Sequence, residues 1–125
     1  MKGIYSALLG VFDSDGEVDA QGVHELVRHK IEGCHVDGLY VNGSTGENFL
    51  MTTEAKKRVF KAAAEAANGE VHLIAHVGSN VLEEVLDLAD YAAELGYDAI
   101  SAVTPFYYKF SVEEIKGYYR TLASQ

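Results

Sequence analysis

The chain has 125 residues, of which 48% are apolar and 23% are charged. This length suits one domain and excludes a multidomain enzyme, and the composition excludes a wholly disordered polypeptide. With 19 acidic against 10 basic side chains, the formal net charge of −9 repels nucleic-acid phosphates and anionic lipid heads, so neither nucleic acid nor a membrane is an expected partner.

The chain begins with an apolar run at residues 4–12 that we predict to be a buried strand. An acidic loop follows, and helical periodicity then predicts a helix over residues 19–32 that Gly33 ends. Its apolar face carries Val23, Leu26, Val27 and Ile31. This strand and helix form the first of four similar units.

The second unit has a predicted strand at residues 38–41 and a helix at 52–68, which Thr52 caps. The third has a strand at 71–77 and a helix that ends at Gly96. Asn80 and Glu83 have the spacing of a capping box for that helix. The residues predicted to face inward are Leu82, Val85, Leu86, Ala89 and Ala93.

The fourth unit has a predicted strand at residues 99–104, followed by the only proline, Pro105. Ser111 and Glu114 then have the spacing of a capping box that opens a last helix. Strands that alternate with helices and lack hairpin signals predict an α/β fold with parallel strands and right-handed crossovers. In such a sheet a strand segment such as Leu73-Ile74-Ala75 is expected to be buried on both faces.

Two architectures fit this alternation: an open doubly wound sheet, or part of a closed barrel. A complete (β/α)8 barrel needs about 250 residues. If the chain is a barrel, residues 1–125 therefore form a single domain that is half of one.

Cysteine and histidine usage gives no sign of a metal site. Cys34 is the only cysteine, so it cannot form an intramolecular disulfide, and a reducing cytoplasm is the expected location. His24, His29, His35 and His72 are scattered without metal-ligand spacing. We interpret His76, at the end of the third strand, as a hydrogen-bonded core residue rather than a general base.

The turn after the second strand, Gly43-Ser44-Thr45-Gly46-Glu47, is the best candidate for a binding site. Sites in parallel α/β folds lie at the carboxyl ends of the strands. Two glycines allow a ligand to approach the backbone, and N–H groups and two hydroxyls can hold a carboxylate. The same pattern is also that of an ordinary turn that ends a strand. It lacks the lysine of a phosphate-binding loop and the spacing of a nucleophile elbow.

Three segments, Gly38 to Glu47, Leu73 to Gly78 and Ser101 to Tyr108, resemble the N-acetylneuraminate lyase branch of the dihydrodipicolinate synthase/lyase family. The resemblance covers essentially the whole chain. It implies that the chain is the (β/α)4 half of a TIM (β/α)8 barrel. It also implies an oligomeric enzyme, without metal or other cofactor, that cleaves N-acetylneuraminate to N-acetylmannosamine and pyruvate through a lysine Schiff base.

The resemblance also implies roles for individual residues. Ser44 and Thr45 would hold the pyruvate carboxylate, with Gly43, Gly46 and Glu47 supporting their loop. Ser44 and Tyr107 would belong to the catalytic proton relay, with Tyr107 reaching the site of a neighbouring subunit.

A Schiff base requires a lysine that is desolvated enough to be partly neutral. The lysines of this chain fall on predicted helices among polar neighbours, at the terminus or in a loop, and none has that environment: Lys2, Lys30, Lys56, Lys57, Lys61, Lys109 and Lys116. The family's lysine lies on the sixth strand. We therefore expect the 125 residues alone to be inactive.

A half-barrel leaves two strand edges unpaired and apolar side chains exposed, which predicts self-association. Two functional classes remain open. One is part of a Schiff-base lyase, whose ligand would be pyruvate or a sialic acid. The other is a non-catalytic half-barrel that self-assembles or binds a small carboxylate.

Overall fold

A computed structural model describes residues 1–124 of the chain. The strands are β1 (Tyr5–Ala7), β2 (Gly38–Val41), β3 (His72–His76) and β4 (Ala99–Ser101). The helices are α1 (Ala20–Arg28), α2 (Thr53–Ala67), α3 (Leu82–Glu94) and α4 (Val112–Leu122). A π-helical turn, His29–Gly33, extends α1, and two 3₁₀ turns, η2 (Ser44–Gly46) and η3 (Asn48–Leu50), separate β2 from α2.

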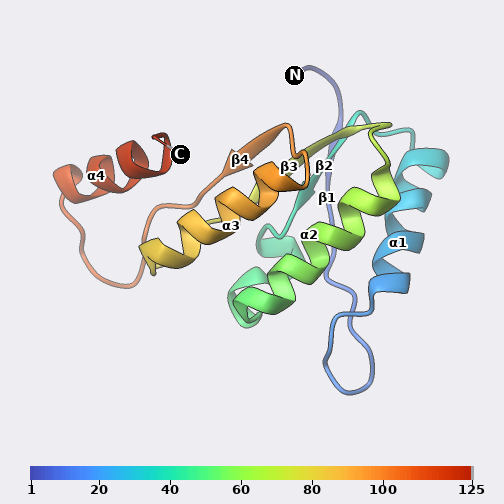
Figure 1. Cartoon of the computed structure of the whole chain (residues 1–125), viewed down its shortest axis with the longest axis horizontal. Coiled ribbons are helices and arrows are strands. Elements are labelled where there is room, and N and C mark those ends of the chain that lie inside the picture. Colours follow the sequence, from blue (N-terminus) through green and yellow to red (C-terminus); the bar gives the residue numbers. More distant parts are fainter. Residues whose placement is uncertain (125) are drawn as a thin grey trace.

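The four strands form one parallel sheet in the order β1-β2-β3-β4. Helices α1, α2 and α3 lie side by side in one layer against this sheet, and α4 stands apart at one end next to α3 (Figure 1). A doubly wound sheet would reverse its strand order at a switch point and carry helices on both faces. The structure therefore has the (β/α)4 arrangement of a half-barrel.

The hydrophobic core lies between the helices and one face of the sheet. Leu39 and Val41 of β2 and Leu73 and Ala75 of β3 point into it, because alternate residues of a strand face the same side. The helices contribute buried residues from their inner faces: Val23, Val27, Val59, Phe60, Ala63, Val85, Leu88, Ala89 and Ala92.

The opposite face of the sheet is not covered by any other part of residues 1–124. Ile74 projects to this face and is only partly buried, whereas its neighbours Leu73 and Ala75 are buried. The prediction that this segment is buried on both faces is therefore wrong for the described residues. The open face is the concave side that the inner wall of a barrel would present.

The first strand is much shorter than predicted. Only Tyr5–Ala7 pair with β2, and Ile4 is 71% exposed. After Ala7 the chain leaves the sheet, and Phe12 instead makes an antiparallel bridge to Val18 that closes the acidic loop. The apolar run at residues 4–12 therefore contains a short strand and, after it, a loop segment whose Val11 packs against the core.

Several helix ends follow the predicted capping chemistry. The side chain of Thr52 caps α2 as predicted. That of Asp19 caps α1, a helix for which no cap is predicted from the sequence. Ser111 and Glu114 form the complete capping box at the start of α4.

Two predictions for α3 are wrong. The residue before the helix is Val81, and Asn80 does not cap it, because its side-chain oxygen accepts the backbone N–H of Phe106 instead. Ala93 is exposed, because the buried stripe of α3 runs through Leu88 and Ala92.

Within residues 1–124, we find no helix with the length and apolar character needed to cross a bilayer.

Candidate functional site

The candidate site lies where the carboxyl ends of β2, β3 and β4 meet. A hollow of about 310 Å³ opens there. Side chains and backbone from all three strands and the loops that follow them line it: Tyr40, Ser44, Phe49, His76, Ser101, Ala102 and Val103. The position agrees with the rule that parallel α/β folds bind ligands at this end of the strands.

The loop Gly43–Glu47 has the compact shape that its glycines predict. A Cβ atom at Gly43 would lie 2.6 Å from the ring of Tyr40, and one at Gly46 would lie 3.0 Å from the carbonyl oxygen of Leu8. A side chain at either position would force its neighbour to move. The chain turns through η2 and then adopts the left-handed conformation at Glu47, with φ of 61°.

This loop presents Ser44 and Thr45 to solvent. Neither hydroxyl has a hydrogen-bond partner within the part of the chain that the structure describes, so both are free to bind a ligand. The backbone of Glu47 helps to hold the loop, because its N–H donates to the carbonyl of Ser44 at 3.0 Å. Its carboxylate is exposed and makes no hydrogen bond to another described residue.

Two polar side chains from non-adjacent strands meet at the floor of the hollow. The hydroxyls of Tyr40 on β2 and Ser101 on β4 lie 3.0 Å apart, spanning β3 between them. Neither residue was singled out from the sequence. Strand alternation could have found them, since both face away from the helices.

His76 is the buried polar residue of the hollow. Its ring lies 6.0 Å from that of Phe49, edge to face, and 6.0 Å from that of Tyr40. Burial, together with the positive charge of Lys56, lowers the pKa of His76, so the imidazole is neutral at pH 7. Its burial, and its hydrogen bonds to Asn48 and Val103, agree with the prediction that it is a core residue.

Tyr107 does not line the hollow. It follows β4, is 88% exposed and has a left-handed backbone with φ of 77°. Its ring packs edge to face against Tyr108, with 5.1 Å between ring centres. Of the two residues expected in the proton relay, Ser44 lines the hollow and Tyr107 does not.

The prediction that no lysine is desolvated is wrong for Lys56. This residue is only 4% exposed, and its ammonium lies 2.7 Å from the carboxylate of Glu84. The partner comes from α3, so helix periodicity within α2 could not reveal it. Although burial alone would raise the pKa of Glu84, hydrogen bonds from Lys56 and Ser79 hold that pKa below its usual value.

Lys56 nevertheless does not line the hollow. Its ammonium is directed between α2 and α3, where Thr53 also donates a hydrogen bond to Glu84. The ammonium of Lys56 is held by Glu84 away from the hollow, so it is not placed to attack a ligand there. Lys56 is thus buried, contrary to the prediction, but it is not a candidate for the Schiff-base lysine of this site.

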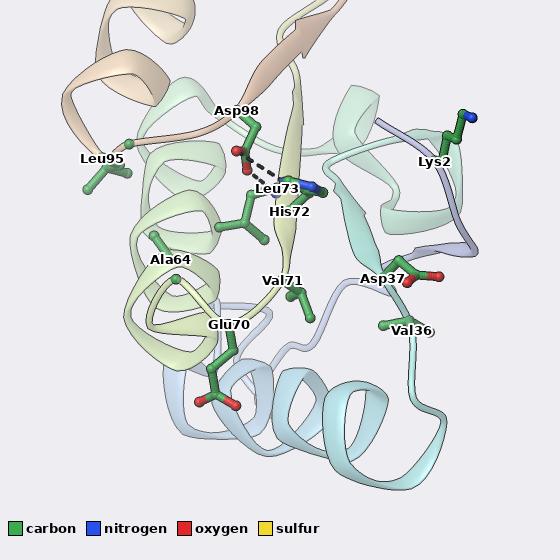
Figure 2. A pocket seen from close by; sticks show the side chains of 12 residues that line it. Lys2, Val36, Asp37, Ala64, Glu70, Val71, His72, Leu73, Leu95 and Asp98 are labelled. Carbon is green, nitrogen blue, oxygen red and sulfur yellow. Dashed lines mark hydrogen bonds and ion pairs between the residues drawn. The ribbon is translucent and has the colours of Figure 1, made fainter.

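A larger hollow, of about 570 Å³, lies at the opposite end of the strands (Figure 2). Figure 2 shows the carboxylate of Asp98 turned toward Leu73 and His72 at this end. The carboxylates of Asp37 and Asp98 in this hollow each accept a backbone N–H at the start of a strand. Among residues 1–124, no group of three or more metal-ligating side chains is placed to hold an ion.

The dihydrodipicolinate synthetase family model matches residues 1–125. The N-acetylneuraminate lyase of Clostridium perfringens is 59% identical over 122 residues, which cover 98% of this chain and 42% of that protein. The N-acetylneuraminate lyase of Haemophilus influenzae is 54% identical over 125 residues, covering 100% of this chain and 43% of the relative. The chain thus spans less than half the length of these relatives.

Solved structures agree closely with the fold. CdNal from Clostridium difficile, crystallised with mannosamine, superposes with a TM-score of 0.97 at 56% identity, covering 99% of this chain and 43% of that one. The N-acetylneuraminate lyase of Fusobacterium nucleatum complexed with pyruvate gives a TM-score of 0.92 at 52% identity, covering 99% and 42%.

Proposed function

Because this chain belongs to the dihydrodipicolinate synthetase family, we propose that its 125 residues form the carboxylate-binding half of an N-acetylneuraminate lyase. The whole enzyme would cleave N-acetylneuraminate to N-acetylmannosamine and pyruvate. The pyruvate complex of the Fusobacterium nucleatum lyase supports the ligand class. The main support within this chain is the exposed pair Ser44 and Thr45 at the carboxyl end of β2.

The loop has the chemistry needed for a carboxylate. The free hydroxyls of Ser44 and Thr45 can each donate a hydrogen bond to a carboxylate oxygen, and such charge-assisted bonds are stronger than neutral ones. The close-packed backbone at Gly43 and Gly46 fixes the hydroxyls before the ligand arrives. The ligand's ketone carbon would then face the uncovered concave side of the sheet.

Tyr107 and Ser44 complete the proposed proton relay only between subunits. The exposure of Tyr107, and its separation from the hollow of its own chain, support a role in the site of a neighbouring copy. The homo-oligomer is thus part of this proposal.

The attacking amine would come from outside this chain's site. The hollow is lined by no lysine from residues 1–124, and the buried Lys56 is paired with Glu84. We therefore propose that the 125-residue polypeptide alone does not form a Schiff base with pyruvate. A second candidate function, binding of a small carboxylate by a self-assembling half-barrel, is supported by the uncovered face of the sheet.

Borohydride trapping with pyruvate tests the lyase proposal. The polypeptide alone should give no covalent adduct by mass spectrometry. Adding the remaining C-terminal part of the Clostridium perfringens lyase should give an adduct on a lysine of that added part. A pyruvate adduct on Lys56 or any other lysine of this chain would contradict the proposal. Binding without trapping in the mixture would favour the non-catalytic half-barrel.

A further inference from the structure

His76 connects the two loops that carry the proposed site residues. The side-chain amide of Asn48, in η3, lies 2.9 Å from Nδ1 of the imidazole. The backbone N–H of Val103, just after β4, donates to Nε2 at 3.2 Å. Asn48 follows the loop of Ser44 and Thr45, and Val103 begins the segment that leads to Tyr107.

These contacts define the protonation state of the ring. Nε2 accepts the N–H of Val103, so it carries no proton. A neutral imidazole then carries its proton on Nδ1, and the possible acceptors beside the ring are the backbone carbonyl of Asn42 and the side-chain amide of Asn48. Nδ2 of Asn48 is the atom that lies 2.9 Å from Nδ1, which would place two donors face to face. We therefore assign the amide in the reverse orientation, with its oxygen accepting from Nδ1–H.

This arrangement leaves no free lone pair for a substrate. Both ring nitrogens are engaged, and the residue is 4% exposed. A general base would need an accessible nitrogen within hydrogen-bond reach of the proton it removes. His76 can therefore act on the site only through the groups that it holds.

Aromatic packing connects the same two loops above the imidazole. Phe49, next to Asn48, packs edge to face against His76 and against Phe106, with 4.9 Å between the centres of the phenylalanine rings. Phe106 directly precedes Tyr107, and its N–H is bound by Asn80. A shift of the imidazole would therefore be transmitted to both sides of the hollow.

We propose that His76 is a positioning residue of this site: its neutral imidazole joins Asn48 to Val103 and so fixes the spacing between the carboxylate loop and the segment of Tyr107. This inference rests on the proposed function for the identity of the ligand. The connection between the loops stands on the hydrogen bonds alone.

Protonation of the ring would break this connection, because Nε2 would become a donor facing the N–H of Val103. The titratable groups around it are Tyr40 on β2, Lys56 on α2 and Glu84 on α3, which is paired with Lys56. Pyruvate binding should therefore weaken as the pH falls and His76 gains its proton.

The first test is spectroscopic and uses the unaltered chain. In ¹⁵N-histidine NMR at pH 7, Nδ1 of His76 should give a protonated-type shift and Nε2 an unprotonated-type shift. The reverse pattern, or a doubly protonated ring, would overturn the proposal. This measurement needs no ligand and no variant, so it remains decisive even if pyruvate does not bind.

The second test compares pyruvate affinities from amide shifts of Ser44 and Thr45. H76A should weaken binding roughly fivefold, whereas H76Q, whose side-chain oxygen can accept the N–H of Val103, should recover most of it. The affinity of the native chain for pyruvate should decrease as the pH is lowered, whereas that of H76Q should stay constant. His24→Gln, an exposed helix position, is the matched control.

The positioning role would be overturned if the native chain, H76A and H76Q bound pyruvate with the same affinity and the same pH dependence. If the native chain binds no pyruvate, the proposed function fails. The amide shifts of Val103 and Phe106 then decide the positioning role: they should move in H76A and return toward native values in H76Q, and unchanged shifts would overturn it.

Discussion

Asp98 binds both backbone groups of Leu73. Its N–H donates to the carbonyl of Leu73 at 3.0 Å, and its carboxylate accepts the N–H of Leu73 at 2.8 Å. Asp37 holds Ile4 in the same way, at 2.8 and 2.7 Å. Each aspartate stands directly before a strand and fixes the start of the preceding one (Figure 2). The pair sets the register of the sheet at its amino-terminal edge.

Replacing Asp98 by alanine should lower the free energy of unfolding by about 1 kcal/mol, because the N–H of Leu73 loses its acceptor. Asp98→Asn should lose less, since its amide oxygen can still accept. Urea unfolding at pH 7 measures both. Asp90→Ala, at an exposed position of α3, is the control and should change little.

The effect of Asp98→Ala should also depend on pH. The hydrogen bond from Leu73, followed by the contact with His72, lowers the pKa of Asp98 in the folded chain. Its contribution to stability is therefore present above the unfolded pKa, about 3.9, and is lost as the pH falls through the folded pKa. The stabilities of the native chain and the variant should converge in acid. A constant difference down to low pH would contradict this assignment.

Replacing Lys56 by methionine should lower the free energy of unfolding by roughly 3 kcal/mol, because Glu84 would be left without its partner between two helices. Lys57→Met is the matched control, since Lys57 pairs with the half-exposed Asp87 and such surface pairs contribute at most about 1 kcal/mol. The double variant K56M/E84L should recover much of the loss. Equal effects of K56M and K57M in thermal or urea unfolding would refute the burial of Lys56.

Ser44→Ala and Thr45→Val should each weaken pyruvate binding roughly tenfold, the loss expected for one hydrogen bond to a charged group. Both residues are exposed, so unfolding should be almost unaffected. Ser14→Ala, in the exposed acidic loop, provides a control. NMR titration measures the affinities. Native affinity in both variants would place the carboxylate elsewhere.

The 125-residue polypeptide should self-associate. Within residues 1–124, β1 pairs only with β2 and β4 only with β3, which leaves two open strand edges. Sedimentation velocity should show a mean mass that rises with concentration. Ile4→Lys, directly before β1, should reduce this rise, whereas Val112→Lys on α4 should not. A monomer at every concentration would disprove association.

Local sequence signals predicted much of the fold. The second strand was predicted at the residues that form it, because Gly38 to Val41 is bounded by an aspartate and a turn. Thr52 and the pair Ser111 and Glu114 cap helices as predicted, since capping depends on residues within one turn.

The failures arose where partners are distant in sequence. Asn80 has the spacing of a cap but bonds to Phe106, 26 residues later. Lys56 has polar neighbours in sequence but is covered by α3. The loop of Ser44 and Thr45 can be predicted because Gly43 and Gly46 flank the pair within one short segment. No motif marks the other residues of the site. Strand alternation directs Tyr40 and Ser101 to it, and a 3₁₀ turn brings Asn48 to His76.

The uninterrupted strand order also bears on how the protein is made. Each strand after the first pairs with the one synthesised just before it, and α2 and α3 each pack against the preceding helix. No segment must wait for a later strand to be inserted between two earlier ones. As the nascent polypeptide leaves the ribosome, each unit can dock on its predecessor, so the sheet can grow in the direction of translation.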